Sequence, residues 1–103
     1  MNSAPPATGA LAVRGRYVFE DRGCSTCHRV GGGPLIGPDL AGVTQRRDDR
    51  WLETWLKDPA AVVAKDEKLQ TWTHEFGDII MPDQNLSDDE IKAVIAYMKE
   101  FPG

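Results

Sequence analysis

The clearest pattern of apolar and polar positions lies near the end of the chain and predicts a helix that begins at Asp88. Ser87 and Glu90 form a capping box, in which each side chain accepts the backbone N–H of the other residue. Pro102 and Gly103 end the pattern. A single apolar stripe at helical spacing is formed by Ile91, Val94, Ile95 and Met98.

A second helix is predicted from Ala10 to Arg22, where apolar residues again fall near helical spacing and Gly23 follows as a stop. Gly15 lies inside this segment, where a glycine costs about 1 kcal/mol relative to alanine. The close approach of another helix would explain this glycine. The alternative is a helix that begins only at Arg16.

The middle of the chain carries shorter helical patterns. A helix of about two turns is expected from Asp48 or Asp49 to Lys57. A further turn from Ala60 to Lys65 and a short helix from Asp66 to Phe76 follow. Glycine and proline crowd residues 30–42 and predict a loop, and no segment alternates in the manner of a strand. The fold class is therefore expected to be all-α.

Composition indicates one small globular domain. The chain has 103 residues, of which 41% are hydrophobic and 27% charged, as in ordinary globular proteins. We expect a flexible lead-in over residues 1–9, without the apolar core of a signal peptide, and a single domain over residues 10–103. The apolar run at residues 60–64, like every other in the chain, is far shorter than the roughly 20 residues of a membrane span.

The balance of charge limits the classes of binding partner that are expected. Twelve Lys and Arg against 16 Asp and Glu give a formal net charge of −4, whereas proteins that bind nucleic acid through its phosphates are usually basic. Nucleic acid is therefore not an expected partner. Because small cores are often supplemented by a disulfide, a metal or a cofactor, the two cysteines are candidates for such a role.

Residues 24–28 read C-x-x-C-H, a motif typical of c-type haem attachment. One turn of backbone can present two thiols to the haem vinyl groups while the adjacent imidazole coordinates iron. The alternatives are a disulfide, a redox-active dithiol or part of a zinc site. A redox dithiol usually accompanies a βαβ pattern and structural zinc usually needs four ligands, so haem is favoured. The cysteines and histidines of the chain are Cys24, Cys27, His28 and His74.

An iron bound to His28 needs a second axial ligand from elsewhere in the chain. Met81 is favoured because histidine with methionine is a known ligand pair, and because Pro82 holds Met81 extended in an irregular segment. The other methionines lie in the lead-in and in the apolar stripe of the last helix. His74 is the rival, which would give a lower potential, and an open sixth position is the third alternative.

With these motifs the chain resembles the class I cytochromes c of bacterial type, which are small monohaem electron carriers. The resemblance implies a cytochrome c fold in which three to five short helices surround one covalent haem c and the first and last helices cross. The matching pieces are Gly15-Arg16-Tyr17-Val18-Phe19, Cys24-Ser25-Thr26-Cys27-His28, Gly37-Pro38-Asp39-Leu40, Met81-Pro82 and Tyr97.

The same resemblance assigns roles to single residues. Gly15 and Phe19 would contact Tyr97 where the two helices cross. The carbonyl oxygen of Pro38 would accept a hydrogen bond from His28, which orients the imidazole. The implied haem site consists of Cys24, Cys27, His28, Pro38 and Met81, with His28 and Met81 on the iron.

One segment departs from the compact bacterial pattern. Residues 64–80 are longer than the loop often found before the methionine, and they could wall the haem, form a docking feature or be an extra helix. Trp51, Trp55 and Trp72 are expected to pack in the core or against the haem. The alternative for a tryptophan is an indole N–H donated to a haem propionate.

The resemblance implies an electron carrier rather than an enzyme. Its partners would be redox proteins that bind transiently through basic patches, and the chain would act as a monomer. The implied location is the bacterial periplasm, which is favoured over the mitochondrial intermembrane space. Two alternatives are a haem enzyme or sensor with an open distal site for a small ligand, and an electron-delivery domain of a larger oxidoreductase.

Overall fold

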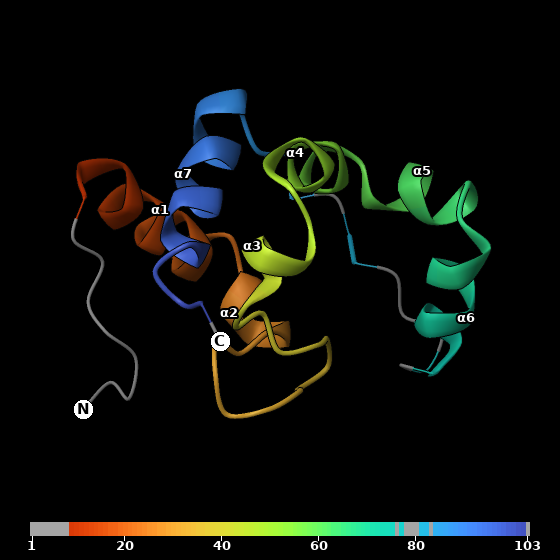
Figure 1. Cartoon of the computed structure of the whole chain (residues 1–103). Helices are drawn as coiled ribbons and strands as arrows, with labels where there is room; N and C mark the ends of the chain where they lie inside the picture. Colours follow the sequence, from red (N-terminus) through yellow and green to blue (C-terminus); the bar gives the residue numbers. More distant parts are fainter. Residues whose placement is uncertain (1–8, 76, 78–80, 83, 103) are drawn as a thin grey trace.

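The computed structural model describes residues 9–75, 77, 81–82 and 84–102, and among these the regular structure is helical, without strands. The expected all-α class is therefore confirmed (Figure 1). Apart from Gly9, the expected lead-in lies outside the described residues. The helices are α1 (Ala10–Asp21), α2 (Cys24–Cys27), α3 (Val43–Arg46), α4 (Asp49–Lys57), α5 (Pro59–Ala64), α6 (Glu67–Glu75) and α7 (Asp88–Met98).

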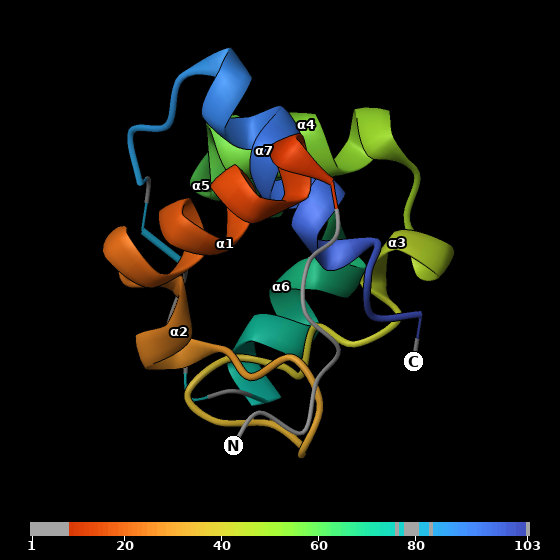
Figure 2. The same cartoon turned by 90° about the vertical axis from the view of Figure 1, so that its left-hand side faces the viewer.

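The first and last helices cross in direct contact, as Figures 1 and 2 show from two directions. A Cβ atom on Gly15 would lie 1.8 Å from the carbonyl oxygen of Ala93, so only glycine allows this approach. Next to the crossing, the rings of Phe19 and Tyr97 have centroids 5.5 Å apart. The expected crossing is thus confirmed, and the helix begins at Ala10 rather than at Arg16.

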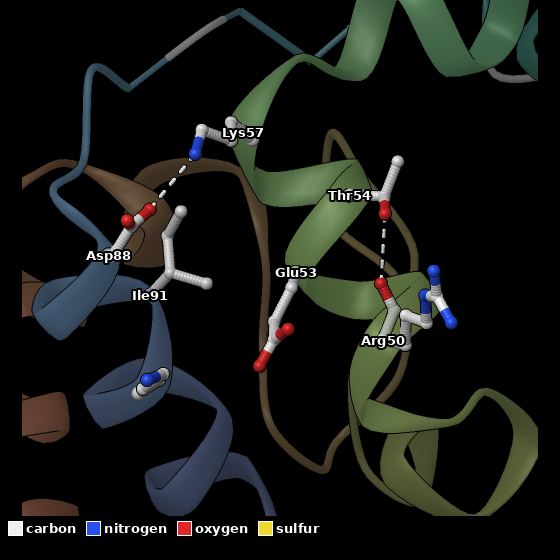
Figure 3. A pocket seen from close by; sticks show the side chains of 7 residues that line it. Arg50, Glu53, Thr54, Lys57, Asp88 and Ile91 are labelled. Carbon is white, nitrogen blue, oxygen red and sulfur yellow. Dashed lines mark hydrogen bonds and ion pairs between the residues drawn. The ribbon is translucent and has the colours of Figure 1, made fainter.

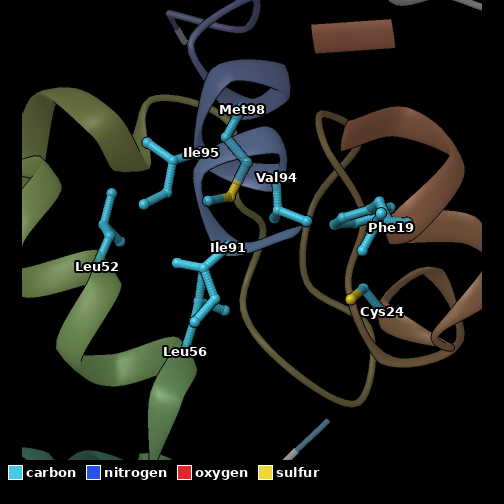
Figure 4. Packing of buried hydrophobic residues seen from close by; sticks show 9 residues of the cluster. Phe19, Cys24, Leu52, Leu56, Ile91, Val94, Ile95 and Met98 are labelled. Atoms are coloured by element: carbon cyan, nitrogen blue, oxygen red, sulfur yellow. The ribbon is translucent and has the colours of Figure 1, made fainter. Parts of the chain in front are cut away.

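The apolar stripe of α7 forms the centre of the core. Figure 4 shows it between Leu52 and Leu56 of α4 on one side and Phe19 and Cys24 on the other. Met98 is only 3% exposed and fills this core, which agrees with its place in the stripe. Burial of an aliphatic or aromatic side chain of this size contributes about 1.5–3 kcal/mol, so the stripe fixes α1 and α4 on opposite sides of α7.

The middle helices follow one another with shared caps. The carboxylate of Asp48 accepts the N–H of Trp51 at 2.8 Å and begins α4. Asp58 ends α4, and its carboxylate accepts the N–H of Ala61 at the start of α5, where Pro59 occupies the first turn. The predicted helix from Asp48 or Asp49 to Lys57 is confirmed.

The two shorter helical patterns are also present, with small changes of boundary. The turn expected from Ala60 to Lys65 is α5, which begins one residue earlier. The helix expected from Asp66 to Phe76 is α6, although Phe76 itself lies outside the described residues. The helical turns α2 and α3 were not predicted as separate helices. Of the helices in the described ranges, none has the length and apolar character needed to cross a bilayer.

Candidate functional site

The two cysteines lie on the single helical turn α2, directly after α1. Gly23 joins the two helices with φ at +80°, a left-handed conformation that favours glycine. Cys24 is 7% exposed and Cys27 is half-buried, and neither forms a disulfide. Burial raises the pKa of the Cys24 thiol. Both thiols are therefore present as separate groups on one turn of backbone.

The imidazole of His28 is oriented by a hydrogen bond to the backbone. Its Nδ1 lies 2.9 Å from the carbonyl oxygen of Pro38. Because a carbonyl can only accept, Nδ1 must carry the proton, and Nε2 of the neutral ring keeps its lone pair for a metal. The backbone N–H of His28 also donates to the carbonyl of Cys24 at 2.9 Å. The hydrogen bond between His28 and the carbonyl of Pro38 is the one that the family resemblance implies.

Gly37 lets the loop lie directly against the imidazole of His28. A Cβ atom at this position would be 2.5 Å from Cε1 and 2.8 Å from Nδ1 of the ring. The backbone N–H of Gly37 donates to the carbonyl of Cys27 at 2.7 Å and closes the loop. One face of the imidazole is therefore covered by backbone, a contact that sequence reasoning did not identify at Gly37.

One carboxylate, that of Asp39, joins three points of the loop between α2 and α3. Asp39 accepts the backbone N–H groups of Gly31 and Gly33 at 2.8 Å and of Ala41 at 2.9 Å. These hydrogen bonds, led by those from Ala41 and Gly31, lower the pKa of Asp39. The carboxylate thus keeps the predicted loop of residues 30–42 in one shape and presents the Pro38 carbonyl to His28.

Met81 lies half-buried against the same apolar cluster that contains Cys24. The indole Nε1–H of Trp55 donates to its sulfur atom at 3.3 Å. This contact was not predicted, because the polar alternative expected for a tryptophan was a hydrogen bond to a haem propionate. A thioether sulfur has two lone pairs, and one of them remains after the hydrogen bond from Trp55.

The chain that follows Met81 is tied to the end of α1. Arg22 donates from Nη1 to the carbonyl of Gln84 at 3.2 Å, and its Nη2 lies 2.9 Å from the carboxylate of Glu90. Glu90 is also part of the capping box with Ser87. Since α2 follows α1 directly, Arg22 connects the region of the two thiols to the segment that carries Met81.

The alternative of a zinc site needs a cluster of metal-binding side chains. Within the described ranges, no three Cys, His, Asp or Glu side chains come together to hold a metal ion. A zinc site built from the cysteines and histidines is therefore not formed in this part of the chain. His74, the rival axial ligand, is exposed on α6.

A groove of about 400 Å³ between α4 and α7 is a separate feature (Figure 3). Charged side chains dominate it, and Lys57 and Asp88 form an ion pair of 3.0 Å across it. None of the predicted site residues lines this groove, so it does not belong to the site. Its lining residues are Arg50, Glu53, Thr54, Lys57, Asp88, Ile91 and Lys92.

The donor set of the site fits a covalently attached haem. Two thiols share one turn, the neighbouring imidazole has a free Nε2, and a thioether sulfur lies against the cluster that contains Cys24. Imidazole nitrogen and thioether sulfur are both ligands of haem iron, and two thiols beside such an imidazole are what covalent attachment of the haem requires. The residues present therefore fit this group.

Comparisons with known proteins agree with this assignment. A sequence model of the cytochrome c family matches residues 12–102. A curated relative, cytochrome c oxidase subunit 2 of Alkalihalophilus pseudofirmus, is 30% identical over 91% of this chain, which spans about a quarter (27%) of that protein.

Two solved structures share the fold. Cytochrome c from Rhodothermus marinus has a TM-score of 0.83 at 25% identity, covering 99% of this chain and 85% of the other. The cytochrome c domain of a Pseudomonas putida protein has a TM-score of 0.73 at 42% identity, covering 84% of this chain and 85% of the other.

Proposed function

The chain belongs to the cytochrome c family, and we propose that it is a one-electron carrier with His28 and Met81 as axial ligands of one haem c. Members of this family bind haem c covalently and transfer electrons. The observation that carries the proposal is the hydrogen bond from Nδ1 of His28 to Pro38, which directs Nε2 away from the backbone as a ligand. The thiols of Cys24 and Cys27 would form the thioether bonds.

Each residue of the site has a defined task. Haem c, once attached, supplies the reversible one-electron couple of its iron. Pro38 and Gly37 keep the imidazole of His28 in one orientation and make it a better donor. Packing of α1, α4 and α7 holds this arrangement rigid, which keeps the reorganisation on electron transfer small.

Met81 is the second axial ligand in this proposal. Its sulfur lies 3.3 Å from the indole nitrogen of Trp55, and its side chain packs against the apolar cluster. A thioether opposite histidine raises the reduction potential relative to a second imidazole. If His28 and Met81 both bound the iron, the chain would leave it no position for a substrate, which favours an electron carrier over an enzyme or gas sensor.

A second candidate places the same chemistry inside a larger oxidoreductase. The chain spans only 27% of the cytochrome c oxidase subunit 2 that it resembles, and a cytochrome c domain of a Pseudomonas putida protein shares its fold. The chain would then deliver electrons within one enzyme. The two candidates differ in partner and share the same haem site.

The proposed location is the bacterial periplasm, where haem c is attached in bacterial members of the family. The net charge of −4 favours transient docking with redox partners that present basic patches. Such steering weakens as salt screens it. A transfer rate that does not change with ionic strength would contradict this docking mode.

The test of the proposal is the visible and near-infrared spectrum of the protein with haem attached. The Met81→Ala variant should keep its covalent haem but lose the weak ferric band at roughly 700 nm that marks thioether ligation. Its potential should fall and the reduced form should bind CO. Met98→Leu is the matched control, because Met98 is buried in the core and should leave the band unchanged.

Three results would contradict parts of the proposal. A band that persists in Met81→Ala would exclude Met81 as the ligand. Fast CO binding by the reduced wild-type protein would favour an enzyme or sensor with an open site. Replacing Cys24 and Cys27 with alanine should abolish covalent attachment, and haem that survives denaturation in this double variant would contradict the thioether assignment.

A further inference from the structure

We propose that Trp55 is the positioning residue for Met81: its indole N–H holds the thioether sulfur in one orientation and withdraws electron density from it. The inference rests on the proposed function, since it takes Met81 as an axial ligand. It assigns to α4 a part in setting the potential, which neither the motif at residues 24–28 nor the comparisons indicate.

The contact itself is specific. Nε1 of Trp55 lies 3.3 Å from the sulfur of Met81, and both side chains are half-buried. An indole nitrogen can only donate and a thioether can only accept, so the direction of the bond is unambiguous. Methionine is unbranched and has three rotatable side-chain bonds, so its sulfur has no fixed orientation of its own. A hydrogen bond to one lone pair of the sulfur therefore selects which lone pair remains for a ligand bond.

The indole is itself held in place by Trp51 on its own helix, which in turn contacts Arg47 at the end of α3. The rings of Trp51 and Trp55 stack with centroids 5.6 Å apart and an angle of 6° between their planes. The guanidinium of Arg47 lies 4.2 Å from the centre of the Trp51 ring, a cation–π contact. Buried Leu52 and Leu56 fix α4 against α7. The donor thus belongs to a rigid helix rather than to a mobile loop.

Two measurable properties follow from this geometry. A sulfur held by one donor keeps a single configuration, which gives a wide and temperature-stable spread of haem methyl resonances in the ferric protein. A sulfur that donates part of its density to an N–H group is a weaker donor to ferric iron, which raises the reduction potential. Both properties depend on the N–H group and not on the bulk of the ring.

The experiment compares Trp55→Phe with Trp51→Phe in the haem-loaded protein. Trp55→Phe should keep the band at roughly 700 nm, but its potential should fall and the spread of methyl resonances should collapse as the sulfur alternates between configurations. Trp51→Phe removes an indole from the same helix, keeps an aromatic ring under Trp55 and leaves the N–H in place. It should resemble the wild type in both readouts.

A second variant separates the hydrogen bond from the packing. Benzothienylalanine at position 55 keeps the bicyclic ring but replaces the N–H group with sulfur, so it should reproduce the effects of Trp55→Phe even if the smaller phenyl ring impairs folding. Unchanged potential and methyl spread in this variant would overturn the inference, as would equal changes in Trp51→Phe. A wild-type protein without the thioether band would instead overturn the ligation by Met81, and this inference with it.

Discussion

The two sides of the candidate haem site are built in different ways. On the His28 side, the imidazole is held by Pro38, ten positions further along the chain, and by the backbone of Gly37. On the Met81 side, the sulfur is held by Trp55, 26 positions away, and the following segment by Arg22, between 62 and 68 positions away. One side is local in sequence and the other depends on the packing of distant helices.

The difference shows which part of the site should yield first. The His28 side consists of a helical turn and a loop whose backbone hydrogen bonds are nearly self-contained. The Met81 side stays in place only while α1, α4 and α7 remain packed. Segments held by only a few side-chain contacts, such as those that Trp55 and Arg22 make here, open at lower free energy than the global fold. We therefore expect the Met81 side to open before the His28 side.

The largest effect is expected from Gly15→Ala, which should destabilise the packing on which both sides of the site depend. In Gly15→Ala the new Cβ would lie 1.8 Å from the carbonyl oxygen of Ala93, so α1 and α7 must separate. We expect the free energy of unfolding to fall by about 2–3 kcal/mol, as for other overpacked contacts. Denaturant unfolding measures this. Gly9→Ala, at the N-cap of α1 with no neighbour within 4 Å, should cost less than about 1 kcal/mol.

Gly37→Ala should affect the His28 side alone. Its Cβ would lie 2.5 Å from Cε1 of His28, so the ring or the loop must move. A loss of about 1–3 kcal/mol is expected, together with a changed His28 signal in the NMR spectrum and an intact thioether band. Gly33→Ala is the control, because that position has φ at +100° but open space. It should cost about 1 kcal/mol of backbone strain without shifting the His28 signal.

Arg22→Gln should affect the Met81 side alone. The change removes the ion pair with Glu90 and the hydrogen bond to Gln84, both partly exposed, so about 1 kcal/mol of stability should be lost. With Met81 as the proposed ligand, added imidazole should displace it from the ferric protein at lower concentration than in the wild type. Arg16→Gln, which breaks an exposed pair with Glu20 within α1, is the control. Equal imidazole affinity in both variants would contradict the role of Arg22.

The smallest effect is expected from acid, and each side has its own carboxylate. Backbone hydrogen bonds lower the pKa of Asp39, and the N–H of Ser87 chiefly lowers that of Glu90, from ordinary values of 3.8 and 4.5. Because these pKa values are lowered on folding, the stabilisation is present above the ordinary values. It is lost as the pH falls through the lowered ones.

Two variants show how much of the stability lost in acid comes from the His28 side and how much from the Met81 side. Asp39→Asn should be less stable than the wild type at neutral pH, and the difference should narrow as acid protonates Asp39 in the wild type. Glu90→Gln should do the same on the Met81 side. Unfolding curves at a series of pH values, with the His28 signal and the thioether band followed separately, test the assignment. A difference between Asp39→Asn and the wild type that is constant with pH would contradict it.

Much of the fold could be predicted because its signals are local. The capping box at Ser87 placed the start of α7, and the misplaced Gly15 indicated the helix crossing that the structure contains. The turns α2 and α3 were missed as helices because four residues carry no periodicity. For the site, the motif at residues 24–28 predicted the attachment chemistry, which stays a prediction for each residue.

The remaining contacts of the site could not be read from the sequence. Nothing near Trp55 in the chain indicates Met81 as its partner, and an arginine such as Arg22 has many equivalent uses on a surface. The role of Gly37 against the imidazole depends on the path of the loop, which Asp39 fixes through three backbone N–H groups. Such contacts depend on tertiary geometry rather than on residue type or spacing.

The crossing of α1 and α7 also has a consequence for folding kinetics. Gly15 and Ala93 touch, although most of the chain lies between them. Loops of this length must lose entropy before the contact is gained, and folding slows as contacting residues become more distant in sequence. We therefore expect this chain to fold more slowly than a helical bundle of equal length in which each helix packs on its neighbours in sequence. The slow event should be the docking of the first helix, α1, onto the last, α7.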